Sequence, residues 1–288
     1  MFLEYNFIMK KFLFALITLL LLTQPTIAWS WNDLTSDEYA VKKLLKSQVK
    51  YANRTDFDKF INTYDSKYIN ADGFNLDTFS SLIKDIWSTY NNIKYDIEIK
   101  NISIKDNNAT VNVIETSYAK ISMNNAYDGE LKSSANTEYK LKKINGKWKV
   151  VSDKVLDETT TMLYGEAKNI DIQLIVPKEI EANKEYCATL EFVPPKGTLA
   201  IASIASDIVE YPQKPTKEVF RALPEDNILE RLFTSNSQNA NEYVVASIGL
   251  TKTSVCSLNI NLSLTGFGYA IKRVNVIPIT NGEINDKG

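Results

Sequence analysis

The chain has 288 residues, of which 44% are hydrophobic and 24% charged, and its formal net charge is −2. This length is enough for two domains, each with its own hydrophobic core. The near-neutral charge gives no excess of basic residues that would attract nucleic acid. There is no histidine and no GxGxxG or GxxxxGK loop, which excludes Ser-His and Cys-His pairs, the usual zinc sites and phosphate loops. We therefore expect no cofactor and no metal.

The amino terminus has the three regions of a secretory signal peptide. Lys10 and Lys11 precede an apolar run at 12–22, and Thr26 and Ala28 are the small residues of a cleavage site. The run is too short for a bilayer core, which needs roughly 20 residues. We expect cleavage after Ala28 and a secreted or periplasmic protein that meets the membrane only through this signal peptide, residues 1–28. An uncleaved anchor is the alternative.

Three helices are predicted next. Residues 36–53 have an acidic start and an apolar stripe at helical spacing. Residues 54–69 predict a second helix with Thr55 or Asp56 as its cap. Residues 75–90 predict a third helix, whose inward side chains are Phe79, Leu82, Ile83, Ile86, Trp87 and Tyr90.

From residue 93 the apolar period changes from 3.6 to 2, which predicts strands. Residues 93–104 alternate and then slip in phase between Ile99 and Ile102, which indicates a β-bulge. Further strands are predicted at 107–118, at about 127–143 and around Trp148, which we expect to be a core residue. Helices followed by an antiparallel sheet indicate an α+β domain.

A resemblance to a known superfamily rests on four features of the sequence. These are the stretches ANRTDFDKF and ADGF, the third predicted helix, and a bent run of strands that ends with NGKWKVV. The arrangement resembles the nuclear transport factor 2-like (NTF2-like) superfamily, which includes ketosteroid isomerase and SnoaL-like enzymes. The resemblance implies a cone-shaped α+β domain over residues 29–165. It says little of function, because this superfamily hosts isomerases, hydratases, ligand binders and protein-interaction domains.

The resemblance also places the isomerases' general-base aspartate on Asp72. Their oxyanion-hole tyrosine falls on Gln48, and their protonated acid falls near Tyr139 or Lys140, so the constellation is incomplete. Asp72 also precedes Gly73 in a good turn sequence, and we favour the turn over the catalytic base.

Glu115 is the other candidate base, since it continues the apolar face of a predicted strand. We favour a strand-end residue that returns to solvent. A ligand pocket beside Glu115 is one interpretation of the aromatic residues Tyr64, Tyr68, Trp87 and Tyr90, which would line it. Tyrosines at helical spacing, however, more often belong to a core.

Residues 156–169 are predicted to bridge the two halves, with a short helix ending near Gly165. Beyond them the pattern is all β. About seven short strands separated by turns predict an immunoglobulin-like β-sandwich over residues 166–288. The short acidic turn PEDN lacks the carboxylate spacing of a calcium loop.

The only cysteines are Cys187 and Cys256, and export permits a disulfide between them. Cys187 alternates out of phase with the apolar residues Tyr186, Ala188 and Leu190, which argues for two separate thiols instead. We favour the disulfide.

Three functions remain in view. The leading interpretation is a non-catalytic exported protein whose cone binds a small apolar ligand or a protein partner, with the sandwich as an interaction or spacer domain. The first alternative is an isomerase or hydratase with Asp72 or Glu115 as base. The second is a structural envelope or adhesion component, with homodimerisation through the open face of the cone's sheet.

Overall fold

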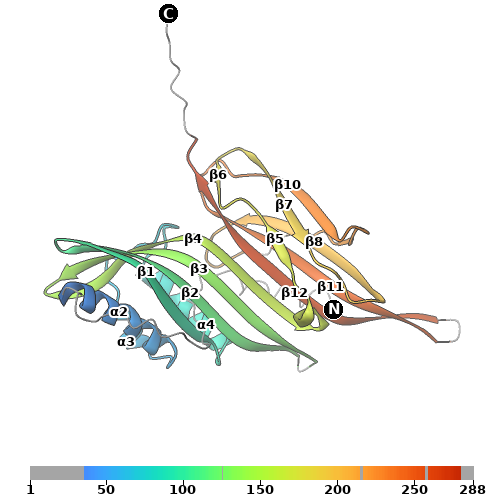
Figure 1. Ribbon diagram of the computed structural model, residues 1–288, viewed down its shortest axis with the longest axis horizontal. Coiled ribbons are helices and arrows are strands. Elements are labelled where there is room, and N and C mark those ends of the chain that lie inside the picture. The colour runs from blue at the N-terminus through green and yellow to red at the C-terminus, as the bar shows by residue number, and fades with distance from the viewer. Residues whose placement is uncertain (1–35, 125, 215–216, 257–258, 280–288) are drawn as a thin grey trace, which may run out of the picture. The chain divides into compact units, whose positions relative to one another are not determined.

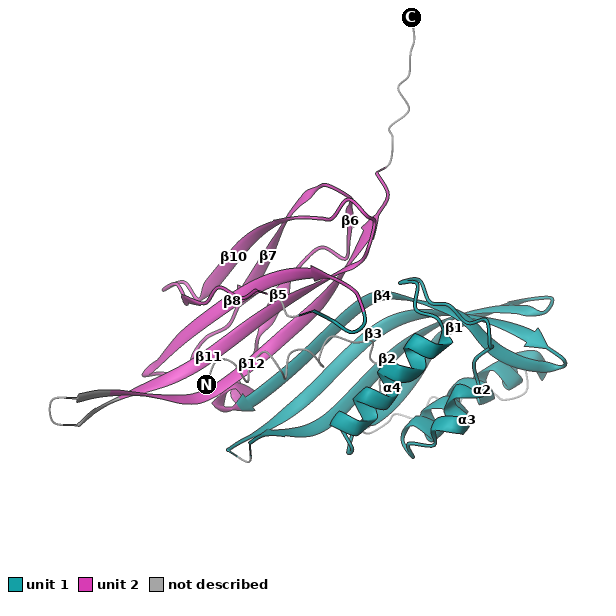
Figure 2. Ribbon diagram, turned by 180° about the vertical axis from the view of Figure 1, so that it is seen from behind, with its two compact units in different colours: residues 1–164, 211–215 teal, residues 165–210, 216–288 magenta. Residues whose placement is uncertain are grey.

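The computed structural model describes residues 36–124, 126–214, 217–256 and 259–279 (Figure 1). For residues 254–256 and 259–260 it describes the backbone alone. The predicted signal peptide and the predicted cleavage site after Ala28 lie outside the described residues. The chain divides into two compact units, coloured separately in Figure 2. Unit 1 comprises residues 1–164 and 211–215, and unit 2 comprises residues 165–210 and 216–288.

Unit 1 begins with the three predicted helices, α2 (Ser36–Ala52), α3 (Phe57–Ile61) and α4 (Leu76–Thr89). Asp56 caps α3, as predicted, by accepting a hydrogen bond from the Lys59 backbone N–H. The prediction of a long second helix is wrong, because α3 ends at Ile61. Beyond it the backbone bonds to a strand instead: the Val150 N–H donates to the Thr63 carbonyl at 3.0 Å.

Four antiparallel strands follow, in the sheet order β1-β2-β3-β4. The helices lie on one face of this sheet (Figure 1). The predicted bulge in β1 is confirmed by a register shift between Ile99 and Asn101. The strands are β1 (Lys94–Lys105), β2 (Asn108–Met123), β3 (Tyr127–Ile144) and β4 (Lys147–Gly165). Three helices and a large antiparallel sheet confirm the α+β prediction for this part of the chain.

Strand β4 corrects the prediction of a bridge with a helix near Gly165. It runs through residues 156–165, and a 3₁₀ turn (Glu166–Asn169) follows it. The physical reason is pairing, because β3 is long and its first half needs a partner, with Gly129 opposite Tyr164 and Ala135 opposite Glu158.

The core of unit 1 is formed by the helices' apolar faces and the covered face of the sheet. Phe60, Tyr64, Tyr68 and Phe79 form a ring cluster, in which the Tyr64 and Phe79 centroids are 5.0 Å apart. Trp148 is 5% exposed, which confirms its predicted core position.

Unit 2 is all β. Its strands form two layers, one in the order β12-β11-β8-β9, with β6 parallel to β12, and a small sheet in the order β10-β7-β5. Tyr186 of β7 reaches across to β11, where its hydroxyl donates to Glu242 Oε2 at 2.8 Å. The strands are β5 (Gln173–Ile175), β6 (Glu179–Glu181), β7 (Glu185–Glu191), β8 (Thr198–Ile208), β9 (Arg221–Ala222), β10 (Ile228–Thr234), β11 (Glu242–Cys256) and β12 (Asn259–Ile277).

Strands β11 and β12 are longer than the short strands predicted for this half of the chain, and they pair with each other as antiparallel neighbours. Strand β10 has the sequence ILERLFT, which mixes charged and apolar residues and gives no clear alternating signal.

Candidate functional site

A row of polar side chains crosses the covered face of the unit 1 sheet. Alternation puts every second residue of β2, β3 and β4 on this face, and several of these positions are polar where a core normally has apolar residues. The buried members are Glu115, Ser117, Ser133, Thr137, Glu158 and Thr160. Buried polar groups need hydrogen-bond partners, so each position needs a structural or functional reason.

Glu115 is the centre of this row. Its side chain is 2% exposed and accepts two hydrogen bonds from β3. The Tyr139 hydroxyl donates to Oε1 at 2.7 Å, and the Thr137 hydroxyl donates to Oε2 at 2.9 Å. The prediction that Glu115 returns to solvent at a strand end is therefore wrong, because β2 continues to Met123 and places this residue in mid-strand.

Burial raises the pKa of Glu115 to about 8. The hydrogen bonds from Tyr139 and Thr137 oppose that rise, and the negative charges of Asp153 and Glu158 add to it. Near neutral pH the carboxyl is therefore mostly protonated. A neutral carboxyl beside a phenol can donate a proton or a hydrogen bond, which is the chemistry of a general acid.

Of the predicted pocket residues, Tyr64 lies near Glu115, and Tyr68 lies beside Tyr64 with their ring centroids 5.0 Å apart. The Tyr68 hydroxyl donates to Asp153 Oδ2 at 2.6 Å, and Tyr64 shares a side-chain hydrogen bond with Tyr139. Both are almost fully buried, and burial raises the pKa of each phenol well above its ordinary value. These hydroxyls bond to neighbouring protein groups.

The other predicted pocket residues have separate partners. The Trp87 indole N–H donates to the Tyr95 hydroxyl at 2.9 Å, and the Tyr90 hydroxyl lies 4.0 Å from Met162 Sδ. Asp72 lies half-buried in a turn, where its backbone N–H donates to Asn70 Oδ1 at 3.0 Å.

Sequence reasoning missed the contribution of Thr137, Asp153 and Glu158. A signal for Thr137 existed, since Thr137, Tyr139 and Leu141 share one phase of β3. Ser117 also belongs to the row, and its buried hydroxyl has no hydrogen-bond partner among the described residues.

Cys187 is exposed on β7 and is a free thiol among the described residues. The side chain of Cys256 lies outside them, so the predicted disulfide remains a prediction. No group of three or more histidine, cysteine or carboxylate side chains in the described part of the chain is placed to hold a metal ion.

Unit 1 also carries an open cleft of about 470 Å³. It lies between one face of α2 and the first residues of β4, with α3 and the residues after it at one side. Its lining residues are Ala40, Lys43, Leu44, Ser47, Tyr51, Lys59, Asn62, Thr63, Gly146, Lys147, Trp148 and Lys149. Its volume lies within the range of small-ligand pockets.

Comparison with known families gives one match. Residues 43–161, less than half of the chain, match the family described as the C-terminal domain of the anti-sigma-I factor RsgI9. No curated protein matches this chain. Within the described ranges, no helix has the length and apolar character needed to cross a membrane.

Several solved structures share a similar region. Bd1075 of Bdellovibrio bacteriovorus is 15% identical with a TM-score of 0.34, and the match covers 41% of this chain and 39% of Bd1075. Kfla4162 of Kribbella flavida is 10% identical with a TM-score of 0.38, over 42% and 89% of the two chains. A Streptomyces avermitilis protein of the NTF2-like family is 12% identical with a TM-score of 0.36, over 42% and 95%. Likeness at this level indicates neither a ligand nor a reaction.

Proposed function

We propose that this is an exported, non-catalytic binding protein, in which an NTF2-like domain binds its ligand or partner and an immunoglobulin-like β-sandwich serves as a second interaction module or a spacer. One observation carries the proposal. Glu115 and the aromatic residues predicted to form a pocket are buried, and their polar groups bond to neighbouring protein groups, as Glu115 does to Tyr139, whereas the cleft beside α2 is open.

The matched family supports a binding role as well. Its description names a domain of an anti-sigma factor and not of an enzyme. Export rests on the sequence at residues 10–28, which has the charged, apolar and cleavage regions of a signal peptide.

Native mass spectrometry of the protein isolated from its own cell envelope tests this function. We expect a mature chain that begins at Trp29 and retains a partner or small molecule, which is released on unfolding. A chain that starts before Trp29 would contradict cleavage at Ala28. If the protein has only the mass of the chain alone at every salt concentration, and chemical cross-linking in the cell envelope captures no partner, the binding role is contradicted.

A second candidate function is supported by the Glu115 carboxyl, whose raised pKa and tyrosine partner suit an acid–base catalyst of isomerase or hydratase type. Its test is deuterium exchange at carbons next to a carbonyl, in a panel of small ketones and enoyl thioesters. Exchange that Glu115→Gln abolishes, while the fold is retained, would establish the enzyme. No exchange above buffer would leave Glu115 a structural group.

A further inference from the structure

The cleft beside α2 has two facing walls with different origins in the sequence. Ala40, Lys43, Leu44, Ser47 and Tyr51 recur at helical spacing, so they form one stripe of α2. The opposite wall comes from residues 146–149, where the β3–β4 hairpin turns into β4. Helix and hairpin are both regular elements, which hold the cleft in a defined shape.

The charge of this cleft is one-sided. Four lysines line it, and no carboxylate is among its lining residues. The whole chain has a net charge of −2, so the cluster does not follow from a general excess of basic residues. A concave surface of one sign attracts ligands of the opposite sign.

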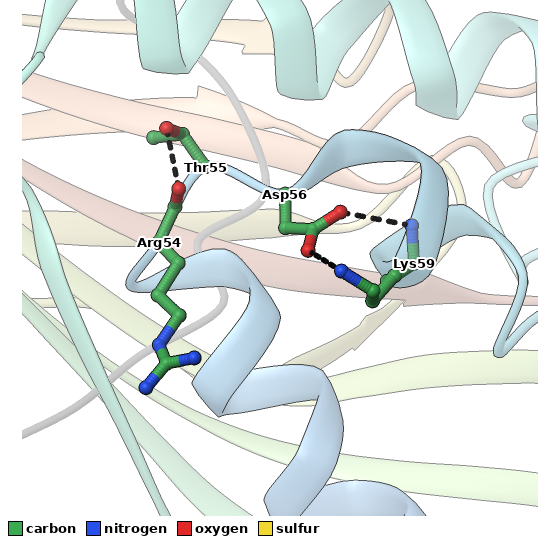
Figure 3. A network of polar contacts seen from close by, with 4 residues as sticks. All are labelled: Arg54, Thr55, Asp56 and Lys59. Carbon is green, nitrogen blue, oxygen red and sulfur yellow. Dashed lines mark hydrogen bonds and ion pairs between the residues drawn. The ribbon is translucent and has the colours of Figure 1, made fainter.

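Two of the four ammonium groups are already engaged. Lys59 pairs with Asp56 (Figure 3), and its Nζ is 2.5 Å from Asp56 Oδ2. The Lys149 ammonium donates to the Asn62 carbonyl. Among the residues that the structure describes, Lys43 and Lys147 have no ion-pair partner, and they lie on opposite walls. An anion between them would meet both charges.

Apolar surface completes the cleft. Leu44 and Tyr51 of α2, both half-buried, line it, and Trp148 of β4, which is 5% exposed, contributes a small part of its ring. The Trp148 indole is held in place, because its N–H donates to Asp37 Oδ1 at 3.1 Å and Asp37 also accepts a hydrogen bond from Lys143. A fixed aromatic ring next to lysines suits a side chain that is itself apolar and flanked by negative charges.

We propose that this cleft binds an acidic peptide segment of a partner protein, with an aromatic or aliphatic side chain against Leu44 and Tyr51 and carboxylates at Lys43 and Lys147. This rests on the binding function proposed above and specifies its site and partner chemistry. The cleft is open along a helix, which favours an extended segment over an enclosed small molecule.

The test uses the mature full chain and a fluorescein-labelled peptide with the sequence Glu-Glu-Phe-Glu-Glu, followed by fluorescence anisotropy. We expect binding that weakens with added salt, as it does for charges near a protein surface. The double variant Lys43→Gln, Lys147→Gln should bind about tenfold more weakly, since it removes both charge pairs with the peptide.

A matched double variant, Lys50→Gln with Lys105→Gln, removes the same net charge from exposed positions outside the cleft and should bind like the wild type. The peptide Lys-Lys-Phe-Lys-Lys should not bind. Equal losses in both double variants would overturn the proposal, because the attraction would then be non-specific. So would binding of free glutamate or benzoate as tight as that of the peptide, which would identify a small-anion site.

Failure of this site is distinguishable from failure of the binding function. If a partner isolated with the protein is retained by the Lys43→Gln, Lys147→Gln variant with unchanged affinity, the binding function stands and the cleft proposal is overturned. If neither the wild type nor either variant retains any partner or small molecule, the broader function fails too.

Discussion

At the scale of single residues, Glu115 is the most informative position in unit 1. A charged carboxylate in this place would be costly, and the hydrogen bonds from Thr137 and Tyr139 offset only part of that cost. The protein therefore holds a proton on Glu115 that the unfolded chain has released by neutral pH.

This difference predicts how stability depends on pH. The pKa of Glu115 is about 8 in the folded protein and about 4.5 in the unfolded chain. Between these values the folded state binds one more proton, so the free energy of unfolding falls as the pH rises through this window. Glu115→Gln removes this titration, and at pH 8 we expect it to be more stable than the wild type by up to a few kcal/mol.

Urea unfolding followed by tryptophan fluorescence measures this effect. Glu98→Gln, at an exposed position of β1, is the matched control and should keep the wild-type pH profile. If Glu115→Gln changes stability by the same amount at every pH, the pKa of Glu115 is the same in the folded and unfolded chain and the interpretation of the network is wrong.

At the scale of elements, the strands β3 and β4 of unit 1 are of similar length and pair with each other over almost their whole extent. The two strands pair from Gly129 and Tyr164 at one end to Ile144 and Lys147 at the other. Gly129 has no room for a side chain. An added Cβ would lie 2.6 Å from Tyr164 Cδ1 and 2.7 Å from the Leu163 carbonyl oxygen.

We therefore expect Gly129→Ala to destabilise unit 1 by about 1–3 kcal/mol, because the carbonyl belongs to the backbone and cannot move aside cheaply. Ser134→Ala, at an exposed position of the same strand, is the control and should change stability by less than about 0.5 kcal/mol. Chemical unfolding monitored by fluorescence distinguishes them. Equal stability of the two variants would show that β3 and β4 separate readily at this end.

At the scale of the whole molecule, the two units carry different probes. All four tryptophans lie at or before Trp148, so fluorescence reports the part of the chain that precedes unit 2. Both cysteines lie in unit 2, and Cys187 is exposed on β7. Each unit can therefore be followed separately in one full-length protein.

Thiol labelling of the native protein decides the state of Cys187. An exposed free thiol should react with a maleimide without denaturant, and Cys187→Ser should remove that label. Protection until a reductant is added, together with a mass lower by two hydrogens, would support the predicted disulfide with Cys256.

The sequence by itself determined the type and order of the elements in unit 1. Helical and alternating periods are local signals, so they predicted α2, the cap of α3, α4, the bulge in β1 and the burial of Trp148. The resemblance likewise predicted helices before an antiparallel sheet.

Only the tertiary structure decided where α3 ends, how far β4 runs and what surrounds Glu115. Residues after Ile61 give up helical hydrogen bonds for partners on β4, and residues 156–165 extend as a strand because β3 lies beside them. The environment of Glu115 depends on side chains from β3 and β4 that are distant in sequence. The α2 cleft likewise joins residues about a hundred positions apart. Periodicity reveals which face of an element is buried, whereas the groups that meet on that face are set by the pairing of distant strands.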